Sequence, residues 1–242
     1  MAEEPSTSAA PGGGTSTPMA RTAHGEIAAA AAAHLTASGY TDEGFSRDKG
    51  EIDRQAPCLI EWARSRHLIL DYNYTSGLKK HPGVSAEHEV FYRSSDDRAV
   101  KKTYAGTFGV TPDRKGDQTA ATPLFYLRRL LLFNKIFLSD LRVEGFCLGG
   151  TSLLIGAKGE QVSIILSQKW ITALDQTHPH PSLAKIENFM KSLGFTSRAS
   201  SYFGWYRAVD DVTVLDARPD NFILSAEGIV PIDLVVSQSR RP

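Results

Sequence analysis

Three oxygen-bearing side chains near the end of the sequence could do chemistry together. Asp216 and Asn221 stand five positions apart in a short turn that contains Pro219, and Asp233 follows Asn221 after twelve positions. Carboxylate and amide oxygens are ligands that a hard cation such as Mg²⁺ prefers, and a carboxylate can also accept the proton of a hydroxyl group. The three residues could therefore hold a hard cation and orient a hydroxyl group beside it.

The same residues also have a purely structural interpretation. Asp and Asn side chains bond their own backbone in turns and Pro presets φ, so residues 216–221 could be a turn and nothing more. Asp233 weighs against this, because it stands in an apolar stretch where a carboxylate is costly to bury without a partner or a metal. Arg218 could stabilise the Asp216 carboxylate or a phosphate.

Candidate nucleotide contacts come earlier in the chain. Lys101 ends a strand-like stretch and could meet phosphates as a point charge, although Lys102 is adjacent and alternation along a strand decides which of the two faces inward. Trp170 follows the strand-like stretch that ends near Leu166 and could be a core residue.

Composition excludes several classes of protein. The chain has 242 residues, enough for one or two domains, and 41% of them are apolar, as in ordinary globular proteins. Basic and acidic residues number 27 each, so no net field draws the chain toward nucleic acid or an anionic membrane. The longest apolar run without alanine includes residues 130–133, and no apolar run in the sequence is long enough to span a bilayer.

Cysteine and histidine patterns give little sign of a metal or disulfide framework. Cys58 and Cys147 lie far apart without a C-x-x-C partner, which favours a reducing cytoplasm and two small buried side chains. His178 and His180 lack an evident third ligand and read as part of a polar loop. Because the N-terminus is acidic and has no apolar h-region, we expect no signal peptide and a cytoplasmic location.

Local patterns predict a mixture of helices and strands. Residues 26–37 and 52–66 are expected to be helical, with Pro57 dividing the second stretch into two pieces. A hairpin turning at residues 94–97 is expected next. The remaining expected elements are helices at 123–137 and 182–193, strands at 142–148, 161–166, 203–208 and 212–215, and a hairpin of 223–224 with 229–234 that carries Asp233.

These elements suggest four regions. Residues 1–23 have a composition that cannot bury enough apolar surface to fold, so we expect a disordered tail. Residues 24–75 form a helical extension, a cap or an interaction segment without catalytic signals. Residues 76–170 would form a strand-rich lobe with one helix, and residues 171–242 a partial second lobe with the Asp/Asn turn.

The order of elements and motifs resembles the protein kinase-like superfamily, in particular its aminoglycoside and choline phosphotransferases. The resemblance covers about residues 83–234. It rests on Asp216-x-x-x-x-Asn221, on Ile232-Asp233-Leu234, on Lys101 at the end of Ala99-Val100-Lys101, and on a loop with the spacing of G-x-G-x-x-G-x-V, in which Gly83 is followed by Ser85 and His88 at two of the glycine positions.

The resemblance implies an α+β class and a minimal two-lobed kinase-like fold with a helical N-terminal extension. It implies Mg²⁺ and ATP as cofactors, with Asn221 and Asp233 on the metal and Asp216 and Arg218 as catalytic residues. The nucleotide contacts that it implies are Lys101, Gly83, Ser85, Gln168 and Trp170. It places backbone groups of Gln168 to Trp170 at the hinge between lobes, where they could bind an adenine edge. No membrane is implied as a partner, and the acceptor or protein partner is left unknown.

The chain departs from that pattern in three places. Protein kinases pair the strand lysine with a glutamate on the next helix, but residues 123–137 contain no acidic residue, which leaves Glu144 as one option. The His that stands just before the catalytic-loop Asp in protein kinases is missing, since Val214 and Leu215 precede Asp216 here. Only eight residues follow Leu234, so we expect the second lobe to be partial, and residues 25–73 could help to bind the acceptor.

Three hypotheses of different classes follow. The chain could be a minimal Mg²⁺-dependent ATP phosphotransferase, a catalytically silent nucleotide-binding pseudokinase, or an α+β interaction protein whose Asp/Asn turn is structural. Stabilisation by MgATP separates the first two from the third, because a ligand that binds only the folded state raises its melting temperature.

Overall fold

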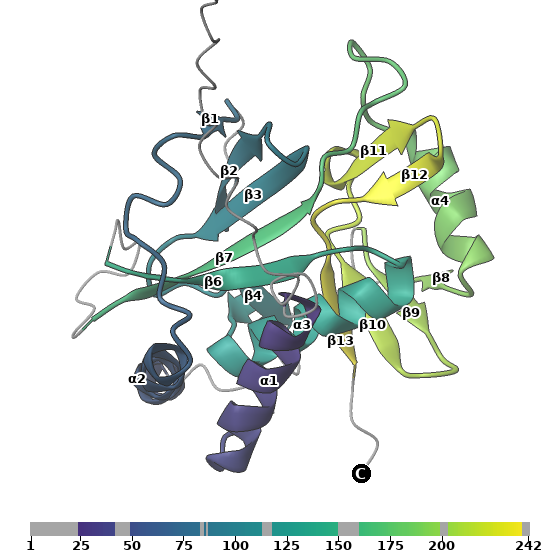
Figure 1. Ribbon diagram of the computed structural model, residues 1–242. Helices are drawn as coiled ribbons and strands as arrows, with labels where there is room; N and C mark the ends of the chain where they lie inside the picture. The colour runs from purple at the N-terminus through teal and green to yellow at the C-terminus, as the bar shows by residue number, and fades with distance from the viewer. Residues whose placement is uncertain are drawn as a thin grey trace, which may run out of the picture.

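The computed structural model describes residues 24–41, 49–82, 85, 87–112, 118–149, 160–198 and 203–238, and the fold has both helices and antiparallel sheets (Figure 1). The predicted α+β class is therefore confirmed. The predicted disordered tail, residues 1–23, lies outside the described residues. The helices are α1 (His24–Ala37), α2 (Lys49–Ser65), α3 (Pro123–Phe137) and α4 (Leu183–Ser192).

A five-stranded antiparallel sheet forms the first half of the molecule. Its strands follow the spatial order β1-β2-β3-β7-β6. The predicted hairpin is confirmed, since β2 and β3 pair with Val90 opposite Lys101. The strands are β1 (Lys79–Lys80), β2 (His88–Arg93), β3 (Arg98–Thr103), β6 (Arg142–Leu148) and β7 (Val162–Lys169), with a separate small hairpin of β4 (Val110–Pro112) and β5 (Gln118–Ala120).

Helix α3 covers one face of this sheet and begins and ends as the sequence predicts. The Thr122 side chain accepts a hydrogen bond from the backbone N–H of Phe125, and Pro123 occupies the first turn, where its missing N–H has no cost. Helix α1 packs against both α3 and β6 (Figure 1). Leu35 of α1 and Leu127 of α3 are fully buried in one cluster that also contains residues of the second half of the chain.

The second half carries a four-stranded sheet and a separate hairpin. Strand order in the sheet is β13-β10-β9-β8, and β11 pairs with β12. A short 3₁₀ turn, Pro219–Asn221, lies between the end of β10 and the start of β11. The strands are β8 (Thr196–Ser197), β9 (Trp205–Arg207), β10 (Val212–Leu215), β11 (Phe222–Ser225), β12 (Gly228–Pro231) and β13 (Val235–Gln238).

The structure corrects three details of the sequence prediction. Helix α2 continues through Pro57 as one helix instead of two pieces. Strand β7 runs three residues past Leu166, which was predicted to end it, so Gln168 belongs to the strand. Asp233 was expected on the hairpin, but β12 ends at Pro231 and Asp233 lies in the connection to β13, a strand that the sequence did not predict.

None of the helices in the described part of the chain has the length and apolar character that a membrane span requires.

Candidate functional site

Strand β3 brings Lys101 to the segment that contains Asp233. The ammonium of Lys101 donates a hydrogen bond to the carbonyl oxygen of Ile232, with an Nζ–O distance of 2.6 Å. Alternation along β3 turns Lys102 to the opposite face, where its Nζ lies 4.9 Å from the centre of the Tyr72 ring. Of the two adjacent lysines, Lys101 is therefore the one beside Asp233.

The Asp216 and Asn221 side chains meet across the turn after β10. The Asn221 Nδ2 amide donates to the Asp216 carboxylate at 2.9 Å and to the Asp216 carbonyl oxygen at 2.8 Å. Arg218 donates from Nε to the other carboxylate oxygen at 2.6 Å. Asp216 itself has a left-handed backbone with φ of 59°, a conformation that Asp and Asn tolerate better than most residues. The three residues thus form one bonded group.

Backbone pairing places Asp233 next to this turn. The N–H of Ile232 donates to the carbonyl oxygen of Asn221 at 2.9 Å. Asp233 is the next residue after Ile232, so it lies close to the end of the turn. Within the described residues, the Asp233 carboxylate accepts no hydrogen bond and forms no ion pair within 4 Å. Burial by itself would raise the pKa of Asp233, but the nearby charges, that of Lys101 foremost, hold it below its ordinary value. Asp233 is therefore an ionised carboxylate without a direct partner.

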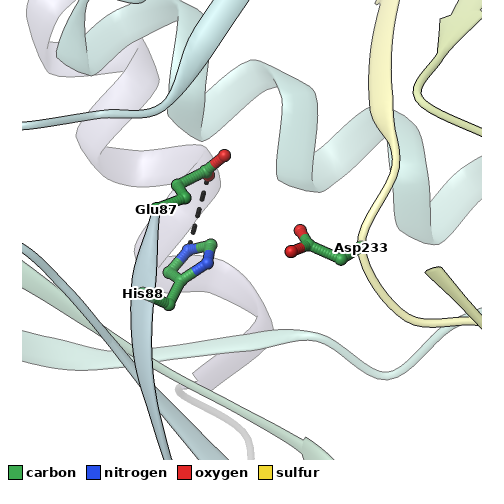
Figure 2. Close-up of side chains that lie close together, drawn as sticks. All are labelled: Glu87, His88 and Asp233. Carbon is green, nitrogen blue, oxygen red and sulfur yellow. Dashed lines mark ion pairs between the residues drawn. The ribbon is translucent and has the colours of Figure 1, made fainter. Parts of the chain in front are cut away.

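The loop before β2 and the first residue of β2 bring further side chains to the site. The Ser85 hydroxyl accepts hydrogen bonds from the backbone N–H groups of Glu87 and His88, at 3.3 and 3.2 Å. Figure 2 shows Glu87 and His88 on one side and Asp233 on the other, with their potential ligand atoms within 4.8 Å of one another. Gly83, which was predicted to contact phosphates, lies outside the described residues.

Helix α3 contributes a buried arginine to the same place. Arg129 is 5% exposed and forms an ion pair with Glu87, whose side chain is also mostly buried. The Glu87 carboxylate packs directly over Gly109, where a Cβ would lie 2.4 Å from the Glu87 Cδ, so only glycine leaves room for it. Burial lowers the pKa of Lys101, an effect that Asp233 and Glu87 partly offset.

Glu144, which the sequence offered as a partner for Lys101, is engaged elsewhere. Its carboxylate accepts from both terminal nitrogens of Arg93, at 2.6 and 2.7 Å, and from the Tyr74 hydroxyl at 2.5 Å. Although burial opposes ionisation, the Arg93 hydrogen bonds lower the pKa of Glu144 to about 2. The sequence interpretation is wrong here, because β6 has a bulge between Val143 and Gly145, at Glu144.

The residues expected at the adenine edge differ in whether their polar groups are already hydrogen-bonded. The backbone N–H of Lys169 donates to the Asp140 carboxylate, and that of Trp170 donates to the Asp97 carbonyl, both at 2.9 Å. The Trp170 ring packs edge-on against Tyr92 with centres 4.9 Å apart. Gln168 differs, since it is 5% exposed and its Oε1 is buried without a hydrogen-bond partner. Its side-chain oxygen, unlike the backbone N–H groups of Lys169 and Trp170, is therefore left without a hydrogen bond within the described residues.

Comparison with known protein families gives one match. A family model described as a Serine/Threonine/Tyrosine kinase found in polyvalent proteins matches residues 53–239. The chain belongs to this family. No curated protein matched the chain, and neither did any solved structure.

The helix after the lysine strand carries a cation, Arg129, in place of an acidic residue. The carboxylate that pairs with it comes from Glu87 in the loop before β2.

Sequence reasoning did not assign roles to Glu87 and Arg129. A signal for Arg129 was present, since Tyr126, Arg129 and Phe133 are spaced to lie on one helix face and all three are buried. An arginine on the apolar face of a helix needs a carboxylate partner. Which carboxylate it meets, 42 residues earlier in the chain, depends on the tertiary fold.

Proposed function

We propose that the chain is a Mg²⁺-dependent kinase that transfers a phosphoryl group from ATP to a hydroxyl acceptor. The observation that carries the proposal is the hydrogen bond from Lys101 to Ile232. Because Ile232 is the neighbour of Asp233 in the sequence, this bond puts a lysine that could bind phosphate beside the proposed metal ligand. The backbone hydrogen bond between Ile232 and Asn221 holds the turn that contains Asp216 close to Asp233 as well. Phosphoryl transfer requires mainly such positioning and charge neutralisation.

The residues present suit a Mg²⁺ ion. Asp233 offers a carboxylate that accepts no hydrogen bond from the described residues, and a charged group in that position gains from a cation. Asn221 donates with its Nδ2 to Asp216, which leaves the amide oxygen as the neutral ligand. A bound Mg²⁺ would supply neutralisation of the charge on the triphosphate.

The protein side chains would divide the remaining work. Lys101 would bind phosphate oxygens with the ammonium that now donates to Ile232. Asp216 would accept a hydrogen bond from the acceptor hydroxyl, with Arg218 and Asn221 fixing its two carboxylate oxygens. Ser85 would support the loop over the phosphates together with Gly83.

Gln168 provides a contact for the adenine ring. In the ladder between β3 and β7, Gln168 pairs with Ala99 and Leu166 pairs with Lys101, so Gln168 and Lys101 face the same side of the sheet. The unpartnered Oε1 of Gln168 would accept a hydrogen bond from an exocyclic amine. Trp170 would contact the nucleotide through its indole ring.

The family description directs the choice of acceptor to the hydroxyl groups of Ser, Thr or Tyr side chains. A small-molecule acceptor, as in aminoglycoside and choline phosphotransferases, is the competing outcome. A chain that binds nucleotide without transfer is the second.

Two measurements test the proposal in order. The melting temperature of the full chain should rise with saturating MgATP, and Asp233→Asn and Lys101→Met should abolish the rise while Asp175→Asn, in an exposed loop, leaves it unchanged. Radiolabelled ATP should then label a mixed protein substrate or the chain itself, and Asp216→Asn should lower that rate by at least about 100-fold. Absence of any MgATP shift contradicts the proposal; a shift without label transfer to proteins or small hydroxyl compounds supports a pseudokinase.

A further inference from the structure

The two ring nitrogens of His88 have different surroundings. His88 is 3% exposed, and its Nε2 lies 2.6 Å from the Tyr126 hydroxyl and 3.4 Å from a Glu87 carboxylate oxygen. Its Nδ1 is buried and has no hydrogen-bond partner. Such an orphaned polar atom in a buried position requires an explanation.

Both groups beside Nε2 can accept a hydrogen bond, the Glu87 carboxylate because it can only accept and the Tyr126 hydroxyl through its oxygen. They are compatible with the tautomer that carries its proton on Nε2. Burial lowers the pKa of His88, which keeps the ring neutral at neutral pH. In this neutral tautomer the Nδ1 atom presents a lone pair.

That lone pair faces a second acceptor. Figure 2 shows the Nδ1 side of the ring turned toward the Asp233 carboxylate, and the two groups belong to the set whose ligand atoms lie within 4.8 Å of one another. Asp233 accepts no hydrogen bond from the described residues, and the ammonium of Lys101 donates to the carbonyl oxygen of Ile232 instead. A cation would stabilise the buried nitrogen lone pair and the partly buried carboxylate that faces it.

We propose that His88 Nδ1 and the Asp233 carboxylate bind a first-row transition-metal dication, at a position separate from the Asn221 side of Asp233. Imidazole nitrogen is a ligand of metals such as Co²⁺ and Zn²⁺, whereas Mg²⁺ takes oxygen ligands. The Nε2–H of a metal-bound histidine ordinarily donates to a carboxylate or similar acceptor, a role that Glu87 and Tyr126 fill here. The site shares Asp233 with the proposed function but does not depend on phosphoryl transfer.

Binding of Co²⁺ alone to the full chain tests the site, with visible absorption and a titration as readouts. The wild type should develop a Co²⁺ absorption band that Zn²⁺ displaces, and His88→Gln should weaken Co²⁺ binding by at least about 10-fold. His178→Gln is the matched control, since His178 also has a nearby carboxylate, Asp175 at 3.2 Å, but is 85% exposed. Its Co²⁺ affinity should equal that of the wild type.

Two further variants keep the test decisive if His88→Gln does not fold. Tyr126→Phe leaves His88 in place and removes its hydroxyl partner, and it should weaken Co²⁺ binding by about 10-fold. Asn221→Ala should reduce the MgATP melting shift and leave the Co²⁺ band intact. The inference is overturned if the wild type binds no Co²⁺, or if His88→Gln and Tyr126→Phe bind it as the wild type does, and neither result affects the MgATP shift that tests the proposed function.

Discussion

At the scale of single residues, the pair formed by Glu87 and Arg129 determines how the loop before β2 lies on helix α3. Both side chains are largely buried, and the loop carboxylate lies where a side chain on residue 109 would otherwise be, which glycine leaves open. Removing one member of a buried ion pair is strongly destabilising because the other charge is then left without compensation. The pair therefore connects the stability of the fold with the position of the loop.

We expect Arg129→Met to lower the free energy of unfolding by about 3 kcal/mol, because Glu87 then remains mostly buried without its ion-pair partner. The double variant Arg129→Met with Glu87→Gln should recover part of this loss. Urea unfolding of the two single variants and the double variant measures the coupling. The matched control is Lys191→Met, which breaks an exposed pair with Glu187 on α4 and should change little. Equal losses in the single and double variants would contradict the coupling.

A second prediction at this scale concerns the backbone of Asp216. Its φ of 59° is unfavourable for most residues, but Asn adopts it readily and Gly without penalty. Asp216→Ala should therefore cost about 1 kcal/mol more in unfolding free energy than Asp216→Gly. Asp216→Asn should be the least disruptive change that removes the charge. Chemical denaturation of the three variants gives the order, and an Asp216→Ala protein as stable as Asp216→Gly would show that the conformation is not strained.

Sequence reasoning reached the residues of the turn but not their neighbours. Asp216, Asn221 and Asp233 could be selected because their spacing is local, within 18 positions of one another. Lys101 could not be separated from Lys102 until the register of β3 was known. The Glu87–Arg129 pair depends on which loop reaches α3, which no local pattern encodes.

At the scale of elements, the bulge in β6 decides where Glu144 points. The register with β7 shifts between Val143 and Gly145, and Glu144 at that shift meets Arg93 and Tyr74. The pKa of Glu144 falls from 4.5 to about 2 in the folded chain. Because the folded-state pKa is the lower one, this contribution to stability is complete above pH 4.5 and is lost as pH falls toward 2.

Glu144→Gln should accordingly lose stability at neutral pH, by about 2 kcal/mol, since Arg93 loses a charged hydrogen-bond partner. Its stability should also fall less steeply than that of the wild type between pH 4.5 and 2. Urea midpoints across that range provide the measurement, with Glu187→Gln on exposed α4 as the control that keeps the wild-type slope. A parallel pH profile for Glu144→Gln would mean that the carboxylate does not titrate as the contacts indicate.

The same bulge requires a residue without a side chain at position 145. A Cβ on Gly145 would lie 2.7 Å from the carbonyl oxygen of Leu68. That segment is held in place by two backbone hydrogen bonds, from the Phe146 N–H to the Leu68 carbonyl and from the Leu70 N–H to the Phe146 carbonyl. Gly145→Ala should therefore destabilise the chain by about 2 kcal/mol through overpacking. Gly77→Ala is the control, because a Cβ there meets nothing within 4 Å. Thermal unfolding of both variants compares them, and equal melting temperatures would contradict the close approach.

Elements with a clear period or cap could be predicted, and the others could not. Helix α3 has a Thr-Pro start and a long apolar run, so both of its ends were predicted. Pro57 was expected to interrupt α2, but packing of Leu59, Ile60 and Ala63 in the core keeps the helix continuous. Strand β13 was missed because its apolar residues continue directly from the segment around Asp233 and no turn signal separates them.

At the scale of the whole molecule, helix α1 and the elements around the candidate site share one core. The same buried cluster contains Leu35 of α1, Leu127 of α3, Phe222 of β11 and Leu234 beside Asp233. A shared core of this kind is expected to unfold cooperatively, as one unit. The helical N-terminal region is then part of the structure that positions the site, whatever else it binds.

Leu35→Ala tests this connection. The side chain is fully buried, so its truncation should lower the unfolding free energy by about 3 kcal/mol through lost contacts and the cavity left behind. Fluorescence from the three tryptophans, of which Trp62 lies in α2 and Trp205 in β9, should follow the same shifted transition as far-ultraviolet circular dichroism. Leu183→Ala is the control, because Leu183 of α4 is 53% exposed and contributes little core packing. If only part of the signal shifted in Leu35→Ala, α1 would unfold independently and the sheet bearing Lys101 would not depend on it.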